Sequence, residues 1–457
     1  MGSDPTAEQA DMPAALDDPT SRCAGTRPVG GRGAAGVAAL AAVATGNLVL
    51  WLVAGPSGES AGRFVGELCG AEAVLLFVCA LVLTTLLPPI ERAFGGLDRV
   101  ALWHRRLAVV GVLLLVPHLA LGNSPPDPYG TTLGRALGSV ALYGIVFLSL
   151  WALAPSLRAA RWPGPVRRLA KAGYERWLAS HRFMGLFVAV AVVHGATVAV
   201  ILHRSTVLDA VYLVTGVVGV AAYLYREIFA RYVVPVHQYS VAAVERLNGT
   251  TVNVGLDPVG DPLVFIPGQF VFVAFGGPGG WRRHPFTVAS SPSVRRLTVS
   301  VKAAGDDTYG IYHRLRPGIP ARITGPFGGF DHRYGGRDQI WIAGGIGITP
   351  FLSWLRSVDQ GFDRNVDLYY CVAHARDALF IDEITATAAG HPSLRLHLVV
   401  ADRDGQLTAS SVMGGRGSEQ VWVYMCGPPA MMTSLSRGFR AHGVPTSRIR
   451  WERFDVR

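Results

Sequence analysis

Charged residues are scarce in this chain. They make up 16% of the 457 residues, whereas 50% of the residues are hydrophobic, and the mean hydropathy is +0.31. Soluble domains carry about 25% charged residues, so the composition excludes an ordinary soluble protein. A chain of this length has room for a membrane domain and one or two globular domains. The net charge of +10 is compatible with a nucleic-acid partner, but no nucleic-acid-binding motif accompanies it, and we predict none.

Cysteine is also rare, and no two cysteines are spaced as CxxC. This pattern predicts neither a disulfide framework nor a zinc or iron–sulfur site. CxxCH, which attaches haem covalently, does not occur either. The five cysteines are Cys23, Cys69, Cys79, Cys371 and Cys426.

Long apolar runs, in contrast, fill the first half of the chain. Six of them are long enough to span a bilayer. They are Ala34–Ala54, Cys69–Pro88, Ala101–Leu121, Leu137–Ala154, Ser180–Leu202 and Leu208–Phe229. Residues 1–33 are rich in Ala, Pro, Asp and Gly and lack an apolar core. We therefore predict a disordered cytoplasmic tail there, not a signal peptide.

Basic residues are distributed unequally over the loops between these spans. One side carries Arg92, Arg99, Arg105 and Arg106 after the second span, and Arg158, Arg161, Arg167, Arg168, Lys171, Arg176 and Arg182 after the fourth. The other side has only Arg63, Arg135 and Arg204. Because basic loops stay in the cytoplasm, both termini are predicted to be cytoplasmic. The compact loops favour a bacterial plasma membrane.

The character of the chain changes after about residue 232. Val, Thr and Phe alternate between Gly and Pro turns up to about residue 336, which predicts an antiparallel β-barrel. From 337 to 457, apolar strands alternate with helical stretches, which predicts a parallel α/β sheet. The strands of that sheet are expected at Ile340–Ala343, Asp367–Val372, Leu394–Val400 and Val421–Cys426.

Four histidines lie in two of the apolar spans, as two pairs. His104 and His118 are 14 residues apart, and His181 and His194 are 13 apart. At about 1.5 Å per residue, each pair spans roughly 20 Å along a helix. One membrane histidine by itself is more often a packed, hydrogen-bonded residue than a ligand. Four at matched depths favour metal binding, because two helices side by side would hold two haems, one above the other.

The helical angle fits the first pair better than the second. At about 100° per residue, His104 and His118 end about 40° apart and share one face. His181 and His194 end about 140° apart on an ideal helix, so the fifth span must bend or wind locally as a 3₁₀ helix. Pro117 is a candidate kink in the third span. His203 and Arg204 are predicted at the outer rim.

This histidine pattern resembles that of the NADPH oxidase and ferric reductase superfamily. The resemblance covers roughly residues 35–457 and implies a six-helix membrane domain (34–231), an FAD-binding barrel (232–336) and a Rossmann-like NAD(P)-binding domain (337–457). It implies two b-type haems. His104 and His181 would hold the inner haem, and His118 and His194 the outer haem.

Two further segments resemble the flavin site of the same family. Pro267-Gly268-Gln269-Phe270 is followed by His284-Pro285-Phe286-Thr287, with His and Phe as in the NADPH oxidases. Phe286 would stack on the flavin, Thr287 would bond near its N5, and His284, next to Pro285, would meet the pyrophosphate. The resemblance adds the positions Lys302, Thr308, Gly325, Phe327 and Gly328. Each motif alone also fits an ordinary strand end or turn.

The nicotinamide site is predicted from two loops. Gly344-Gly345-Ile346-Gly347-Ile348-Thr349-Pro350 follows a strand and opens a helix, so its backbone can approach a pyrophosphate. Cys426-Gly427-Pro428 resembles the family's nicotinamide-side loop, with Cys426 near the ring, although a buried structural thiol is the alternative. Arg376 is a candidate for a 2′-phosphate of NADPH, or else a solvated surface residue. In the tail, Phe454 (or Trp451) would cover the flavin.

The resemblance implies transmembrane electron transfer. NAD(P)H would give a hydride to FAD, and single electrons would pass through the two haems to an external acceptor. We predict O₂, reduced to superoxide, as that acceptor. Reduction of ferric or cupric chelates and supply of electrons to a periplasmic partner protein remain open. A haem sensor without turnover is disfavoured, because both redox domains look complete.

Overall fold

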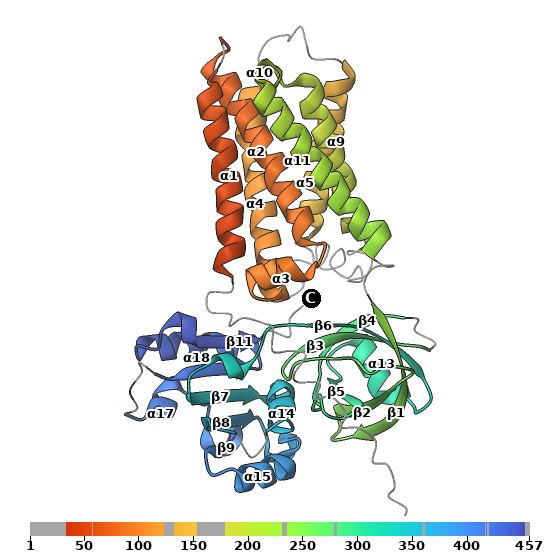
Figure 1. Ribbon diagram of the computed structural model, residues 1–457, viewed down its shortest axis with the longest axis vertical. Helices are drawn as coiled ribbons and strands as arrows, with labels where there is room; N and C mark the ends of the chain where they lie inside the picture. The colour runs from red at the N-terminus through yellow and green to blue at the C-terminus, as the bar shows by residue number, and fades with distance from the viewer. Residues whose placement is uncertain are drawn as a thin grey trace, which may run out of the picture.

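The computed structural model describes residues 33–56, 58–122, 132–152, 179–230, 235–277, 281–358, 362–415, 417 and 420–452. It consists of a helical bundle standing on two β-rich domains, one barrel-like and one α/β (Figure 1). The predicted tail up to residue 32, Cys23, the basic residues from Arg158 to Arg176, and Phe454 lie outside the described residues.

Among the described residues, six helices are long and apolar enough to cross a membrane, which agrees with the six predicted spans. The helical elements of the bundle are α1 (Ala34–Ala54), α2 (Ala61–Leu83), α3 (Pro88–Phe94), α4 (Leu97–Gly122), α5 (Thr132–Ala152), α9 (Met184–Val198), α10 (Val200–Arg204), α11 (Thr206–Leu224) and the π-turn η2 (Tyr225–Phe229). The helix α2 packs along α4, and α5 packs along α9. Helix α4 carries His104 and His118, α9 carries His194, and His181 lies just before α9.

The connection after the second span differs from the prediction. It holds a short helix, α3, which begins with prolines in its first turn and ends at Gly95 in the left-handed conformation. The next helix starts directly at Leu97. Arg99, Arg105 and Arg106 are therefore residues of the first three turns of α4 and not loop residues as predicted.

The fifth span is not a continuous helix. His181 ends a short helical stretch, Arg182 and Phe183 form a turn, and α9 begins at Met184. Within this turn Phe183 N–H donates to Ser180 O at 3.1 Å, a tight i to i−3 bond. The local winding that the 13-residue spacing required is therefore present between the two histidines.

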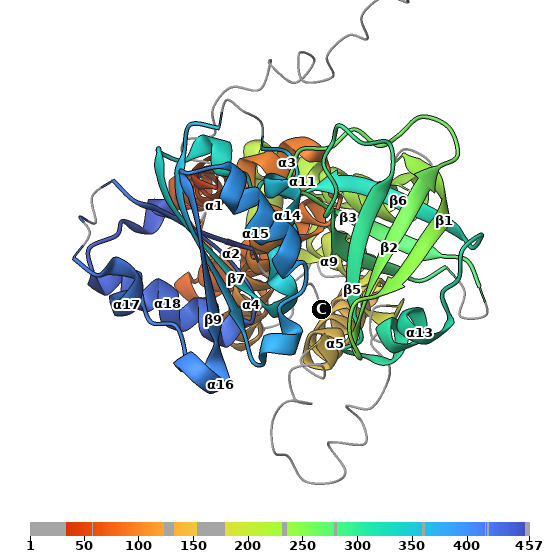
Figure 2. The ribbon, with the colours of Figure 1, turned by 90° about the horizontal axis from the view of Figure 1, so that it is seen from below.

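The barrel domain is one curled antiparallel sheet. Its strands are β1 (Val236–Arg246), β2 (Thr251–Pro258), β3 (Phe270–Phe275), β4 (Arg283–Thr287), β5 (Leu297–Lys302) and β6 (Pro320–Phe327), in the order β4-β3-β6-β1-β2-β5. An isolated bridge between Val288 and Val299 brings the two edges together. Alternate residues such as Val252, Val271 and Ile323 point inward and are fully buried. Helix α13 (Asp306–Arg314) lies beside β5 (Figure 2).

The α/β domain has a parallel five-stranded sheet. Its strands are β7 (Asp338–Gly344), β8 (Asn365–Val372), β9 (Leu394–Val400), β10 (Trp422–Cys426) and β11 (Ile449–Glu452), in the order β11-β10-β7-β8-β9. Helices α14 (Thr349–Leu355) and α15 (Ile381–Gly390) lie on one face; α17 (Ala409–Met413) and α18 (Pro429–Ala441) lie on the other (Figure 2). The chain leaves β7 for β8 on one side and places β10 on the other. The strand order therefore switches between β7 and β10, where parallel sheets bind ligands.

Helix α14 also joins the two β-rich domains. Trp354 Nε1–H donates to Pro267 O at 3.0 Å, and Ser353 Oγ–H donates to Ser290 O at 2.8 Å. Trp354 stacks on Phe330 with ring centroids 4.8 Å apart. The barrel domain and the α/β domain are thus held in a defined orientation.

Candidate functional site

The four predicted histidines form two pairs inside the bundle. The ring centroids of His104 and His181 are 6.3 Å apart, and those of His118 and His194 are 6.2 Å apart. A metal ion bound between two imidazole nitrogens, each about 2 Å away, would place the ring centroids about 6 Å apart. Among the described residues no group of three or more His, Cys, Asp or Glu side chains could hold a metal ion. Each histidine pair therefore offers a metal ion two imidazole ligands.

Backbone carbonyls orient three of these rings. His104 Nδ1 lies 2.9 Å from Ala80 O, His118 Nδ1 lies 2.9 Å from Gly66 O, and His194 Nδ1 lies 2.8 Å from Gly134 O. A carbonyl only accepts, so Nδ1 carries the proton and Nε2 keeps its lone pair for a ligand bond. Ala80 and Gly66 are 14 residues apart on α2, the same spacing as His104 and His118 on α4.

Small residues make room for two of the rings. A Cβ on Gly70 of α2 would lie 2.6 Å from His118 Nδ1, and a Cβ on Gly138 of α5 would lie 2.6 Å from His194 Cε1. Either contact is too short for real atoms, so only glycine permits these helices to approach the imidazoles so closely. The outer histidine pair is therefore held from both sides by backbone.

Beyond the outer pair, the end of the bundle is polar. Glu67 of α2 accepts from Val200 N–H at 3.1 Å and from Ile201 N–H at 2.9 Å. These two residues start α10, just after the helix is interrupted between α9 and α10. Arg204 pairs with Glu59 at 2.7 Å, and His203 lies 3.3 Å from Asp209. His203 and Arg204 thus lie at the rim, and both contact carboxylates there.

The His284–Thr287 motif forms strand β4, which pairs with β3 so that Thr287 faces Phe270 and Phe286 faces Val271. The hydroxyl of Thr287 is buried and has no hydrogen-bond partner among the described residues. A buried hydroxyl without a partner is costly, so this orphan fits a site whose ligand completes it. The position suits the predicted bond from Thr287 to a flavin.

Other predicted flavin residues are partly engaged within the protein. His284 Nε2 lies 3.6 Å from Asp307 Oδ2, on the first turn of α13. Thr308 Oγ accepts from the N–H groups of Ala304 and Gly305, each at 3.0 Å, and so caps α13. Lys302 ends β5 with an exposed side chain. The Thr308 hydroxyl therefore shapes the turn that precedes α13.

The turn after β6 lies close to β3. Phe327 packs on Phe270 and Phe272 with ring centroids 5.9 and 5.6 Å apart. Gly325 and Gly328 both have a positive φ, which residues with a side chain rarely adopt. Gln269 Nε2–H donates to Gly328 O at 3.1 Å, so the two flavin motifs hold each other.

The two predicted nicotinamide loops meet at the switch point of the parallel sheet. Gly344 ends β7, and the turn η4 (Gly345–Ile348) leads to Thr349 and Pro350 at the start of α14. A Cβ on Gly344 would lie 2.7 Å from Pro428 Cδ, and one on Gly427 would lie 2.9 Å from Gly344 Cα. Gly347 likewise leaves no room for a side chain beside Cys426 O. Glycine thus brings the two loops into backbone contact.

Cys426 is fully buried at the end of β10, opposite Glu452 of β11. Burial, reinforced by the nearby Glu452 carboxylate, raises the pKa of the Cys426 thiol well above its usual value. The thiol stays protonated at neutral pH and is a neutral packing group, not a thiolate nucleophile. A Cβ on Gly328 would lie 3.5 Å from Glu452 Oε1. The turn Gly325–Gly328 (the flavin turn) and Cys426 are therefore both neighbours of Glu452.

Arg376 lies in the exposed turn η5 (Ala375–Asp377) after β8, on the side of the sheet where the nucleotide loops are. The neighbouring His374 is in contact with Asp402. Trp451, the alternative cover for the flavin, is a half-buried residue of β11.

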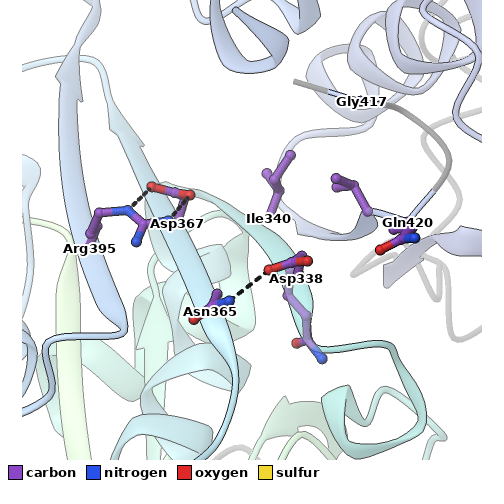
Figure 3. A pocket seen from close by; sticks show the side chains of 9 residues that line it. Asp338, Ile340, Asn365, Asp367, Arg395, Gly417 and Gln420 are labelled. Carbon is purple, nitrogen blue, oxygen red and sulfur yellow. Dashed lines mark hydrogen bonds and ion pairs between the residues drawn. The ribbon is translucent and has the colours of Figure 1, made fainter. Parts of the chain in front are cut away.

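A pocket of about 680 Å³ opens at the opposite, amino-terminal edge of the same sheet (Figure 3). Its polar groups bond with one another: Arg395 bonds to the buried Asp367 at 2.7 Å, and Asn365 Nδ2–H donates to Asp338 Oδ1 at 2.8 Å. His397 Nε2 also lies 2.8 Å from Asp367 Oδ1. Parallel sheets bind ligands at the carboxyl edge, and none of the predicted site residues lines this pocket.

Comparison with known proteins assigns the two β-rich domains. A family model described as FAD-binding domain matches residues 236–326, and one described as oxidoreductase NAD-binding domain matches residues 341–437. These residues form an FAD-binding domain and an NAD-binding domain. The orphan Thr287 hydroxyl lies in the first matched segment, and both glycine loops lie in the second.

Similar proteins are electron-transfer components of the ferredoxin-reductase type. The toluate 1,2-dioxygenase electron transfer component of Pseudomonas putida is 26% identical over 226 residues, which cover 48% of this chain and 67% of that protein. The ferredoxin–NAD(+) reductase component of the alkene monooxygenase system of Xanthobacter autotrophicus is 28% identical over 234 residues, which cover 48% of this chain and 70% of that protein. These relatives are NAD(P)H-dependent oxidoreductases.

A solved structure extends the likeness in fold. The flavohemoglobin from Malassezia yamatoensis with bound FAD and heme has a TM-score of 0.51 at 14% identity, and the match covers 85% of this chain and 98% of that one. At this identity the likeness shows the fold alone.

Some residues of the site do not stand out in the sequence. The carbonyls of Ala80, Gly66 and Gly134 orient the histidines, but any residue type carries a carbonyl. Glu452 lies beside Cys426 and Gly328, but one Glu among aromatic residues gives no signal of its own in the sequence. Glu91 of α3 contacts the FAD-binding domain, as described below. A single Glu between two apolar spans gives no signal in the sequence.

Proposed function

We propose that this chain transfers electrons across a membrane, from NAD(P)H through FAD and two b-type haems to an acceptor on the far side, and that O₂, reduced to superoxide, is the acceptor. The observation that carries the proposal is the arrangement of two histidine pairs, one above the other along the helical bundle. The ring centroids within the pairs are 6.2 and 6.3 Å apart, and the bundle stands on an FAD-binding and an NAD-binding domain. The histidine pattern also supports the resemblance to the NADPH oxidase and ferric reductase superfamily.

The residues present fit both kinds of cofactor. His104 and His181 would hold the haem nearer the FAD-binding domain, and His118 and His194 the other. Thr287 would donate its buried hydroxyl to FAD, whereas Phe286 and His284 would flank it. When bound, FAD would take up a hydride from NAD(P)H and release single electrons, which the haems would carry across the apolar layer.

The NAD(P)H would bind where the Gly344–Gly347 loop meets Cys426, Gly427 and Pro428. The bare backbone of these glycines gives a pyrophosphate access to N–H groups at the start of η4 and α14. Protonated, apolar Cys426 and the Glu452 carboxylate would flank the nicotinamide side of the flavin. Arg376, exposed and permanently charged, would meet the 2′-phosphate.

We further propose the domain limits 34–231 for the membrane domain, 232–336 for the FAD-binding domain and 337–457 for the NAD(P)-binding domain. Residues 1–33 would be a cytoplasmic tail, and both redox domains would be cytoplasmic. The support is the position of both redox domains at one end of the bundle. This end carries α3 and the start of α4, where His104 lies (Figure 1).

The test begins with the full chain purified in detergent. It should carry about two haems and one FAD per chain, with haem released by acidic solvent because no CxxCH exists. His118→Ala or His194→Ala should remove one haem and leave NAD(P)H-to-flavin transfer intact. His203→Ala, a histidine at the rim, is the matched control and should keep both haems. Two haems in both ligand variants would refute the assignment.

The acceptor needs a second measurement on the same preparation. NADPH-driven reduction of O₂, followed as dismutase-sensitive superoxide, is compared with reduction of a ferric chelate under anaerobic conditions. Faster reduction of the chelate at matched concentration would favour the metal-reductase alternative. Slow turnover with both, despite full reduction of the haems, would point to a partner protein.

A further inference from the structure

A hydrogen bond joins the helical bundle directly to the FAD-binding domain. Gly328 N–H donates to Glu91 Oε1 at 2.8 Å, across 237 positions of sequence. The carbonyl of the same glycine accepts from Gln269 Nε2 at 3.1 Å. Gly328 is therefore held on one side by its own domain and on the other by α3.

Glu91 extends from a platform that is firmly packed. Phe94, on the same short helix, is 5% exposed and lies in a cluster with Ala80, Leu83 and Val100. On the α1 side Phe94 lies so near Gly36 that a Cβ there would be 2.5 Å from its ring. The helix α3 is thus fixed against α1, α2 and α4.

The same platform is connected to a histidine of the inner pair. Ala80, in the cluster around Phe94, provides the carbonyl that orients His104 at 2.9 Å. The helix α4, which carries His104, begins at Leu97, directly after α3. A shift of α3 would therefore move the surroundings of His104 as well.

On the other side, the contact lies at the meeting point of the two redox domains. Gly328 is the last residue of the flavin turn and lies near Glu452. Glu452 pairs in register with Cys426. Glu91 therefore connects the inner histidine pair to the place where flavin and nicotinamide would meet. A carboxylate bonded to a backbone N–H is a strong, charge-assisted contact.

We propose that Glu91 is a positioning residue, which docks the FAD-binding domain on the bundle and sets the distance between the flavin and the inner haem. The consequence for rate rests on the proposed function, whereas the docking itself does not. As a positioning residue, Glu91 is not assigned a contact with the reacting atoms. It acts through Gly328 and through the packing of α3.

The experiment compares three variants of the full chain. Glu91→Ala removes the acceptor, and Glu91→Gln keeps an acceptor oxygen without the charge. Arg92→Ala is the control, because Arg92 lies on the same helix with an exposed side chain that bonds only within α3 among the contacts the structure describes, to Pro88 O at 3.2 Å. Hydrogen exchange of the segment 325–330 and stopped-flow absorbance of flavin and haem are measured for each.

Glu91→Ala should speed exchange at Gly328 and slow haem reduction several-fold, because electron transfer slows as the distance between donor and acceptor grows. Reduction of the flavin by NAD(P)H should keep its rate, and both haems should be retained. Glu91→Gln should lie close to the unmodified chain, because its amide oxygen still accepts the bond. Arg92→Ala should match the unmodified chain in every measurement.

Unchanged exchange at Gly328 in Glu91→Ala would overturn the docking contact. Faster exchange with an unchanged rate of haem reduction would overturn the positioning role. If the unmodified chain binds no haem, the proposed function fails, and the exchange measurement still decides whether Glu91 docks the domain.

Discussion

Helix α2 packs closely on His118 at Gly70, and adding one carbon atom there should remove one haem. In Gly70→Ala the new Cβ would lie 2.6 Å from His118 Nδ1 and 2.8 Å from Cε1. Non-bonded heavy atoms prefer about 3.5–4.0 Å. The imidazole must therefore move by about 1 Å or α2 must move away, and the 2.9 Å bond to Gly66 O is strained in either case.

The energetic balance has two opposing parts. Ala in a helix interior is favoured over Gly by about 1 kcal/mol, whereas overpacking costs about 1–3 kcal/mol. More important than this small net cost is the direction of the shift, because it pushes an imidazole away from a bond of about 2 Å. Haem retention should therefore fall far more than the stability of the fold.

The assay is the haem-to-protein ratio, together with a potentiometric titration of the haem absorbance. Gly70→Ala should lower the ratio from about two to about one and remove one of two redox components. Gly138→Ala on α5 should do the same, because its Cβ would lie 2.6 Å from His194 Cε1. Gly46→Ala on α1 is the matched control, since no described atom outside the adjacent backbone of α1 lies within 4 Å of its Cβ. Two haems with unchanged potentials in both Gly70→Ala and Gly138→Ala would refute the reasoning.

Three further outcomes are expected in the redox domains. Thr287→Val keeps the shape of the side chain but removes the orphan hydroxyl, so FAD affinity should fall by roughly fivefold, about 1 kcal/mol, whereas Thr287→Ser should retain it; equal affinities by fluorescence titration would contradict the role. Arg376→Ala should raise the KM for NADPH by roughly ten- to a hundredfold, as for a lost charge-assisted contact of about 1.5–3 kcal/mol, and leave the KM for NADH unchanged; equal changes for both nucleotides would exclude phosphate recognition. Burial among aromatic rings lowers the pKa of His332 from 6.5 to about 4, so the unfolded chain takes up a proton below pH 6.5 that the folded chain does not, and acidification from pH 6.5 to 4 should lower the free energy of unfolding by about 3 kcal/mol. His332→Phe should flatten this part of the pH profile in thermal unfolding followed by tryptophan fluorescence, and an unchanged slope would show that other groups cause it.

The extent to which the sequence predicts this structure depends on the range of the interactions involved. The apolar spans and the strands β7 to β10 follow from local composition and alternation, and the structure has them within a few residues, except that α2 begins eight residues before the predicted Cys69. There the Ser60 side chain caps α2 by accepting from Arg63 N–H. The first turns of α2 contain polar residues, so the apolar pattern alone begins the span too late. The angular mismatch between His181 and His194 predicted a distortion, and the turn at Arg182 and Phe183 provides it.

The amino-acid sequence by itself determined which residue types are available: paired histidines at helical spacing, glycines where backbones must touch, and a hydroxyl and an aromatic ring in one strand. These follow from periodicity, which acts over a few residues. Tertiary structure alone decided which groups meet, because contacts such as Glu91 with Gly328, Gly70 with His118, and Cys426 with Glu452 join distant segments. Such contacts depend on how whole helices and sheets pack, and no local pattern of residues encodes them.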